Sequence, residues 1–108
     1  MTKMFRQGDV LIQQIPAAQV PKTTTEIPRE AGRVVLAHGE VTGHAHAIQD
    51  PGVCFLRAEG TTDRFLTVSA DGALVQHEEH DTISLSGGSY RVRIQREYDG
   101  AMSRRVED

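Results

Sequence analysis

The sequence predicts an all-β fold, either a small antiparallel barrel or a sandwich of about seven or eight short strands. Short runs rich in Val, Ile, Leu, Phe and Thr recur along the chain, and turn-forming Gly, Pro and Asp residues separate them. No stretch has the apolar spacing of an ordinary amphipathic helix. In the clearest run, Tyr90, Val92 and Ile94 alternate with polar residues, which is typical of a strand with one buried face.

The first clear strand covers residues 10–15, after a turn at Gly8 and Asp9 and before Pro16, which ends it. Residues 16–32 contain three prolines and a run of threonines, so they predict a long proline-containing loop. Further strands are expected at residues 33–37, 44–48, 53–57, 64–68, 73–77, 82–85 and 90–98.

Three turn signals predict how these strands are connected. Residues 50–52 (Asp-Pro-Gly) have the composition of a tight turn. Residues 70–72 (Ala-Asp-Gly) predict a hairpin between the strands on either side, and the glycine pair at 87–88 predicts another. Residues 101–108 are expected to form a flexible tail.

Length and composition restrict the class of protein. The chain has 108 residues and 11.9 kDa, which fits a single β domain over residues 1–108. A formal charge of −3 does not favour a nucleic-acid binder. The one cysteine, Cys54, cannot form an internal disulfide, and its place in an apolar run predicts a buried side chain. No apolar run is long enough for a membrane span and no signal peptide is recognisable, so the expected location is cytoplasmic.

The histidines are the most informative feature. All five lie between positions 38 and 80, and four of them form two close pairs. His44 and His46 are two residues apart, so both side chains would face the same side of a strand. His77 and His80 are three apart and would face one side only on a turn, a helix or a bulged strand. His38 is expected to be an ordinary surface residue.

These two pairs predict a divalent metal site formed by His44, His46, His77 and His80. Four imidazoles can bind zinc, the first choice here, or supply most of the ligands for iron, manganese or nickel. Four protein ligands are typical of a structural site, and three with an open position are typical of a catalytic one. The neighbouring Glu78 and Glu79 are the candidates for a general base.

The segment Gly39-Glu-Val-Thr-Gly-His-Ala-His46 resembles the first metal-binding motif of cupins. This resemblance implies a small β-barrel of two antiparallel sheets and a third histidine ligand, either His77 or His80. It also implies that Asp50 stands where cupins carry a glutamate ligand. The interval from Gly39 to the first histidine is one residue shorter than in the cupin motif. Most of the chain is also similar to small phage and bacterial proteins of unassigned function, which implies no activity.

Three functions remain open from the sequence. The first is a metal-dependent enzyme acting on a small molecule. The second is a metal-free ribonuclease with two histidines as acid and base and a nearby cation, for which the candidates are Arg64, Arg91, Arg93 and Arg96. The third is a non-catalytic module that holds a structural metal and binds a protein partner. A homodimer could also form by covering a sheet edge with a second copy.

Overall fold

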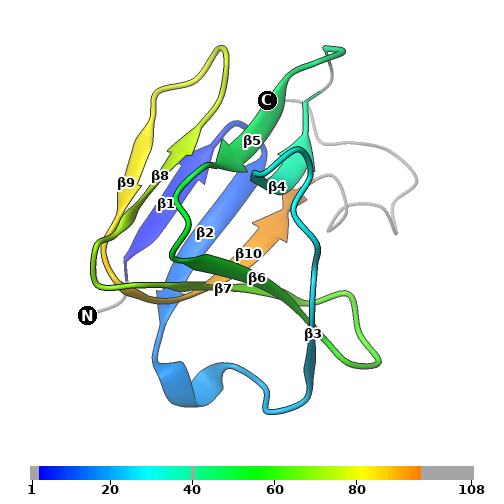
Figure 1. Cartoon of the computed structure of the whole chain (residues 1–108), viewed down its shortest axis with the longest axis vertical. Coiled ribbons are helices and arrows are strands. Elements are labelled where there is room, and N and C mark those ends of the chain that lie inside the picture. Colours follow the sequence, from blue (N-terminus) through cyan, green and yellow to red (C-terminus); the bar gives the residue numbers. More distant parts are fainter. Residues whose placement is uncertain (1–2, 40, 96–108) are drawn as a thin grey trace.

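The computed structural model describes residues 3–39 and 41–95, which form ten strands and one short 3-10 helix (Figure 1). Every strand pair is antiparallel, so the predicted all-β class is confirmed. The elements are β1 (Met4–Gln7), β2 (Val10–Ile15), η1 (Ala17–Gln19), β3 (Thr24–Glu26), β4 (Val34–His38), β5 (Ala45–Ile48), β6 (Val53–Ala58), β7 (Arg64–Val68), β8 (Ala73–Gln76), β9 (Ile83–Leu85) and β10 (Gly88–Ile94).

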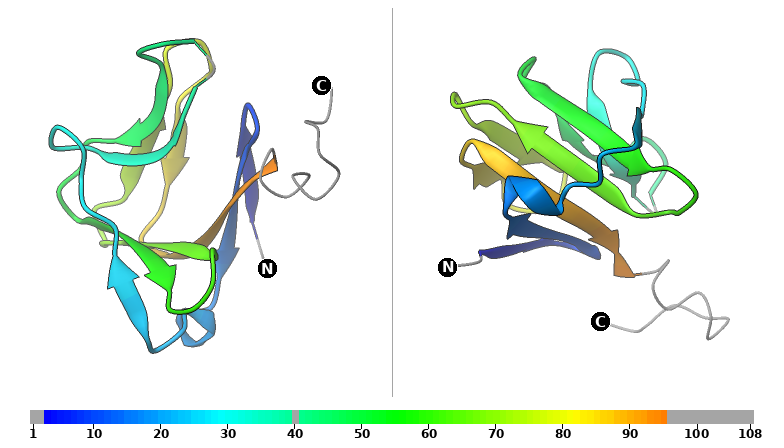
Figure 2. Two further views of the ribbon diagram at one scale, coloured as in Figure 1. Left: turned by 90° about the vertical axis from the view of Figure 1, so that its right-hand side faces the viewer. Right: turned by 90° about the horizontal axis from the view of Figure 1, so that it is seen from below.

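The strands form two layers, so the fold is sandwich-like and not a closed barrel (Figures 1 and 2). One sheet has six strands in the order β1-β2-β10-β7-β6-β3, and the other has four in the order β4-β5-β8-β9. The main core lies between them, because alternate residues of each strand face the opposite sheet. Its largest fully buried members include Ile12, Ile48, Leu66 and Tyr90.

Four connections between the described strands carry the chain from one sheet to the other: the longer one from β3 to β4, and three short ones that we call the sheet-crossing connections. The three short ones join β5 to β6, β7 to β8, and β9 to β10. The predicted hairpins at residues 70–72 and 87–88 are therefore wrong, because the strands beside each turn belong to different sheets. The connections meet at Ser69, whose backbone N–H donates to the Gly52 carbonyl at 2.9 Å. A Cβ at Gly87 would lie 2.7 Å from the Ser69 carbonyl oxygen, so this approach requires glycine.

Three of the four hairpin turns that join described strands gather at the end of the molecule away from these connections. The register pairs Val10 with Ile94 and Ile15 with Ser89, which places the β1–β2 turn at the end of the molecule away from the sheet-crossing connections. The β4–β5 and β8–β9 loops leave the same ends of their strands, and both lie at the top of Figure 1. We call this end, formed by these three hairpin turns, the open end.

Several local expectations change in the structure. The predicted loop at 16–32 contains η1 and the edge strand β3, which pairs with β6. The sequence also missed β1. Cys54 is exposed, so the prediction of a buried thiol is wrong: its neighbours Val53 and Phe55 face the core, and Cys54 faces outward. The predicted tail at 101–108 lies outside the described residues.

No helix within residues 3–39 and 41–95 has the length and apolar character that crossing a bilayer requires.

Candidate metal centre

The four paired histidines come together at the open end. His44 immediately precedes β5, His46 lies within it, and His77 and His80 lie in the β8–β9 loop. The ring centroids of His46 and His77 are 4.3 Å apart, and those of His77 and His80 are 4.7 Å apart. The ring centroids of His44 and His77 are 5.7 Å apart, and those of His46 and His80 are 6.0 Å apart. The two sequence pairs therefore form one cluster.

Strand pairing explains this convergence. Ala47 pairs with Gln76 and Ile48 pairs with Val75, so the chain leaves β8 beside the start of β5. The β8–β9 loop then turns back over the adjacent ends of β5 and β8. This turn lets His77 and His80 face the same group of rings although they are three residues apart. Of the three arrangements that the sequence left open, the structure has a turn, within the six-residue loop at 77–82.

His46 is the most deeply buried of the four, with 3% of its surface exposed, and Gln7 orients its ring. The Gln7 side-chain nitrogen donates to the backbone carbonyls of Val75 at 3.0 Å and Asp81 at 2.9 Å. The Gln7 oxygen is therefore left to accept, and His46 Nδ1 donates to it at 2.8 Å. In neutral His46 the lone pair is then on Nε2, which lies 3.9 Å from the Asp9 carboxylate.

His77 has the opposite arrangement of its ring nitrogens. The backbone N–H of Glu79 donates to His77 Nδ1 at 3.0 Å, so neutral His77 carries its proton on Nε2. Burial lowers the pKa of His77 below its ordinary value of 6.5, and the positive charge of a protonated His80 lowers it further. The Glu78 and Glu79 carboxylates oppose this shift only in part.

The two glutamates occupy different positions. Glu78 accepts the backbone N–H of Ala45 at 3.0 Å, and hydrogen bonds from backbone amides lower the pKa of its carboxyl. One ligand atom from each of His44, His77 and Glu78 lies within 4.8 Å of the others, a spacing that a metal ion could bridge. Glu79 lies 3.8 Å from His44 Nδ1, a buried nitrogen with no hydrogen-bond partner in the described part of the chain.

Sequence reasoning missed Gln7 and treated Asp9 only as part of the turn with Gly8. The turn is present, with a positive φ at Gly8, but nothing local in the sequence indicated that β1 would bring these side chains to His46. His38 lies outside the cluster and pairs with Glu30 at 3.0 Å, as expected for a surface histidine. The carboxylate of Asp50 accepts the backbone N–H of Leu74 at 2.9 Å, next to the sheet-crossing connections.

One comparison with known proteins gives a match. Residues 6–95 match the family described as "Domain of unknown function (DUF8820)", which covers most of the chain and the whole histidine cluster. No curated protein and no solved structure shows a significant match. The description of the family names no activity, so a function has to be argued from the site.

Proposed function

We propose that this chain, which belongs to the DUF8820 family, binds a divalent metal ion through His44, His46, His77 and His80, with zinc as the first choice. The convergence of four imidazoles from two hairpins is the observation that supports this proposal most directly. Imidazole is the commonest metal ligand among side chains, and it suits zinc, iron and nickel. The proposal extends to a metal-dependent enzyme acting on a small molecule.

The hydrogen bonds of the cluster support metal binding unequally. Gln7 holds the proton of neutral His46 on Nδ1, so Nε2 is the nitrogen through which His46 would bind an ion, in the same way that outer partners orient histidine ligands in known metal sites. His77 can bind an ion only after the hydrogen bond from the Glu79 amide breaks, because either Nδ1 binds the ion or the proton moves from Nε2 to Nδ1. Metal binding should therefore shift the amide proton resonance of Glu79, which gives a local signal for ligation by His77.

The carboxylates suggest two separate roles in catalysis. Glu78 stays ionised because backbone amides bind it, so it suits an oxygen ligand better than a proton carrier. Glu79 is more than half exposed and lies beside His44, so it can orient that ring or accept a proton from a bound water. We therefore place the general base at Glu79 and an oxygen ligand at Glu78, which with His44 and His77 makes three ligands and leaves a position open for water, as in catalytic sites.

The metal-free ribonuclease is supported by one observation, the lowered pKa of His77, which keeps that imidazole neutral and basic near pH 7. The nearby cation that this ribonuclease would also require has less support. Arg64, Arg91 and Arg93 line a separate hollow on the six-stranded sheet, and no histidine is among its described lining residues. Arg96 lies outside the described residues. The metal site is the better supported function.

The test is a measurement of metal content on the full chain purified without a histidine tag. Elemental mass spectrometry should find about one zinc, iron, manganese or nickel ion per chain. Zinc added to EDTA-treated protein at a hundredfold excess over the dissociation constant should stabilise it by about 2.7 kcal/mol. The substitution His77→Gln should weaken zinc binding by about 10- to 100-fold, whereas His38→Gln should leave it unchanged.

Two outcomes would contradict the proposal. One is metal-free protein whose melting temperature does not respond to zinc, and the other is equal loss of zinc affinity in the His38 and His77 variants. Substitution with Co²⁺ then separates catalytic from structural sites. A visible spectrum that changes when azide is added indicates an open position, and an unresponsive four-coordinate spectrum favours the non-catalytic module with a structural metal.

A further inference from the structure

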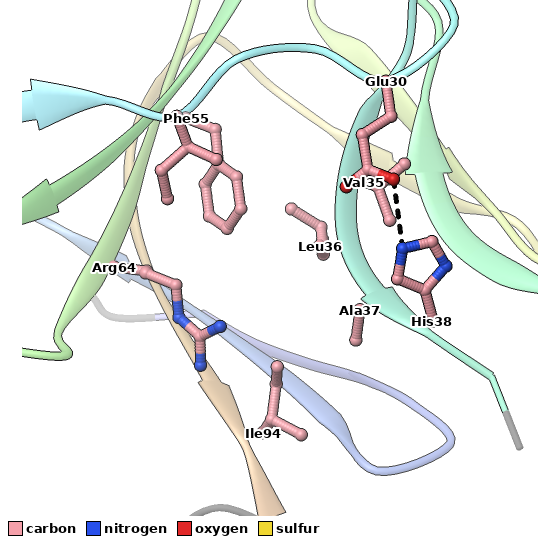
Figure 3. Close-up of a pocket in the computed structure, with 9 residues that line it drawn as sticks. Glu30, Val35, Leu36, Ala37, His38, Phe55, Arg64 and Ile94 are labelled. Carbon is pink, nitrogen blue, oxygen red and sulfur yellow. Dashed lines mark hydrogen bonds and ion pairs between the residues drawn. The ribbon is translucent and has the colours of Figure 1, made fainter.

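A second hollow, separate from the histidine cluster, lies between the two sheets. Its volume is about 560 Å³, within the range of ordinary small-molecule sites. Most of the described side chains that line it are apolar, and Leu36, Phe55 and Ile94 form its walls (Figure 3). These three come from β4, β6 and β10, so the hollow is bounded by both sheets.

One cation enters this apolar space. Arg64 is the first residue of β7 and shares its inner face with Leu66 and Val68, both of which belong to the core. Figure 3 shows its guanidinium extended into the hollow, between Phe55 and Ile94. Arg64 thus brings a positive charge to the side of the hollow that Phe55 and Ile94 line with apolar groups.

The opposite rim carries a hydrogen-bonded pair. His38 Nε2 lies 3.0 Å from the Glu30 carboxylate, and both residues line the hollow. Figure 3 shows this pair on the β4 side, across from Arg64. The Glu30 carboxylate disfavours a dianion more strongly than a monoanion, because the repulsion grows with the charge of the ligand. A ligand with one negative charge that binds at Arg64 and keeps its apolar part against the walls therefore fits the hollow better than a phosphate does.

We propose that this hollow binds a small organic monoanion, a carboxylic acid with an apolar body. The carboxylate pairs with the Arg64 guanidinium, and the body packs on Leu36, Phe55 and Ile94. A guanidinium has five N–H donors, so Arg64 can bind a carboxylate and still keep protein partners. The site is independent of the proposed metal ion, since none of the clustered histidines lines it.

The test uses octanoate as the probe, with octylamine as a matched cation. Calorimetry and NMR on the full chain should show saturable octanoate binding, with the largest shifts at Leu36, Phe55 and the Arg64 side chain. The substitution Arg64→Met keeps the aliphatic stem and should weaken octanoate binding by about 10- to 100-fold. Arg93→Met, at an exposed residue of β10, should leave it unchanged.

A further variant guards against loss of folding. Arg64→Lys keeps the charge and loses the planar fork, so it should retain octanoate binding more tightly than Arg64→Met does. The proposal is overturned if millimolar octanoate does not saturate a site, if octylamine binds equally well, or if the folded Met variant binds octanoate as the unaltered chain does.

Discussion

At the scale of single residues, Gln7 decides where the proton of His46 lies. It is 2% exposed, and its amide joins β1 to His46, Val75 and Asp81 by three hydrogen bonds. The substitution Gln7→Leu removes these bonds and leaves buried polar atoms without partners. We expect the free energy of unfolding to fall by about 1–3 kcal/mol, and zinc affinity to fall by about 10- to 100-fold, as measured by urea denaturation and calorimetry.

Gln49→Leu is the control for this prediction, because Gln49 is exposed and lies outside the cluster. A Gln7→Leu protein that loses stability and binds zinc normally would show that Gln7 has only a structural role. A Gln7→Glu variant adds a second readout. Its carboxylate can still accept from His46 Nδ1 and cannot donate to both carbonyls, so it should recover more of the zinc affinity than of the stability.

His77 makes the stability of the metal-free protein depend on pH. Its pKa in the folded chain is lowered, so between that pKa and pH 6.5 the unfolded chain binds more protons than the folded chain. The contribution of His77 to the free energy of unfolding is therefore fully present above pH 6.5, and it is lost as the pH falls from 6.5 through the lowered pKa of the folded chain. Urea denaturation in EDTA should show this decline, and His77→Gln should flatten it. An equally steep decline in the variant would assign the effect to other groups.

At the scale of elements, the β1–β2 turn shapes the histidine cluster through Gly8. Gly8 has φ +60°, and a Cβ there would lie 2.9 Å from His80 Nε2 and 3.3 Å from His46 Cε1. Gly8→Ala should cost about 1–2 kcal/mol for the left-handed backbone and should also move His80, which weakens zinc binding. Gly60→Ala is the matched control, because Gly60 has φ +77° and nothing lies within 4 Å of its Cβ position.

Both alanine variants should lose comparable backbone stability, and only Gly8→Ala should lose zinc affinity in a calorimetric titration. Equal zinc affinity in the two variants would mean that the turn does not set the position of the histidines.

The elements also show what the sequence could predict about the site. The i, i+2 spacing of His44 and His46 predicts that both side chains face one side of a strand. In the structure His44 immediately precedes β5, and each of the two rings lies beside His77. His77 and His80 required the pairing of β5 with β8, which is a contact between distant segments. Gln7 and Asp9 required the position of β1 against both sheets, and no local pattern carries that information.

At the scale of the whole molecule, the alternating apolar residues predicted the class of fold because they report burial on one face. They could not predict the topology, because a tight glycine turn serves equally well for a hairpin and for a connection between sheets. The segments at residues 70–72 and 87–88 were therefore assigned to hairpins. What distinguishes these two segments from hairpin turns is their close contact with Ser69, which exists only after both sheets have formed.

The sheet-crossing connections and the histidine cluster lie at opposite ends of the sandwich, so we expect the two ends to act independently. Gly87→Ala places a Cβ 2.7 Å from the Ser69 carbonyl oxygen and 2.9 Å from the Ala70 Cα, both backbone atoms that cannot move without shifting a connection. We expect urea denaturation to show a loss of about 1–3 kcal/mol. The histidines lie at the open end, so the dissociation constant for zinc should stay within about twofold of that of the unaltered chain. A Gly87→Ala protein that is folded but binds zinc as weakly as Gly8→Ala would show that the sheet-crossing connections and the histidine cluster are coupled through the core.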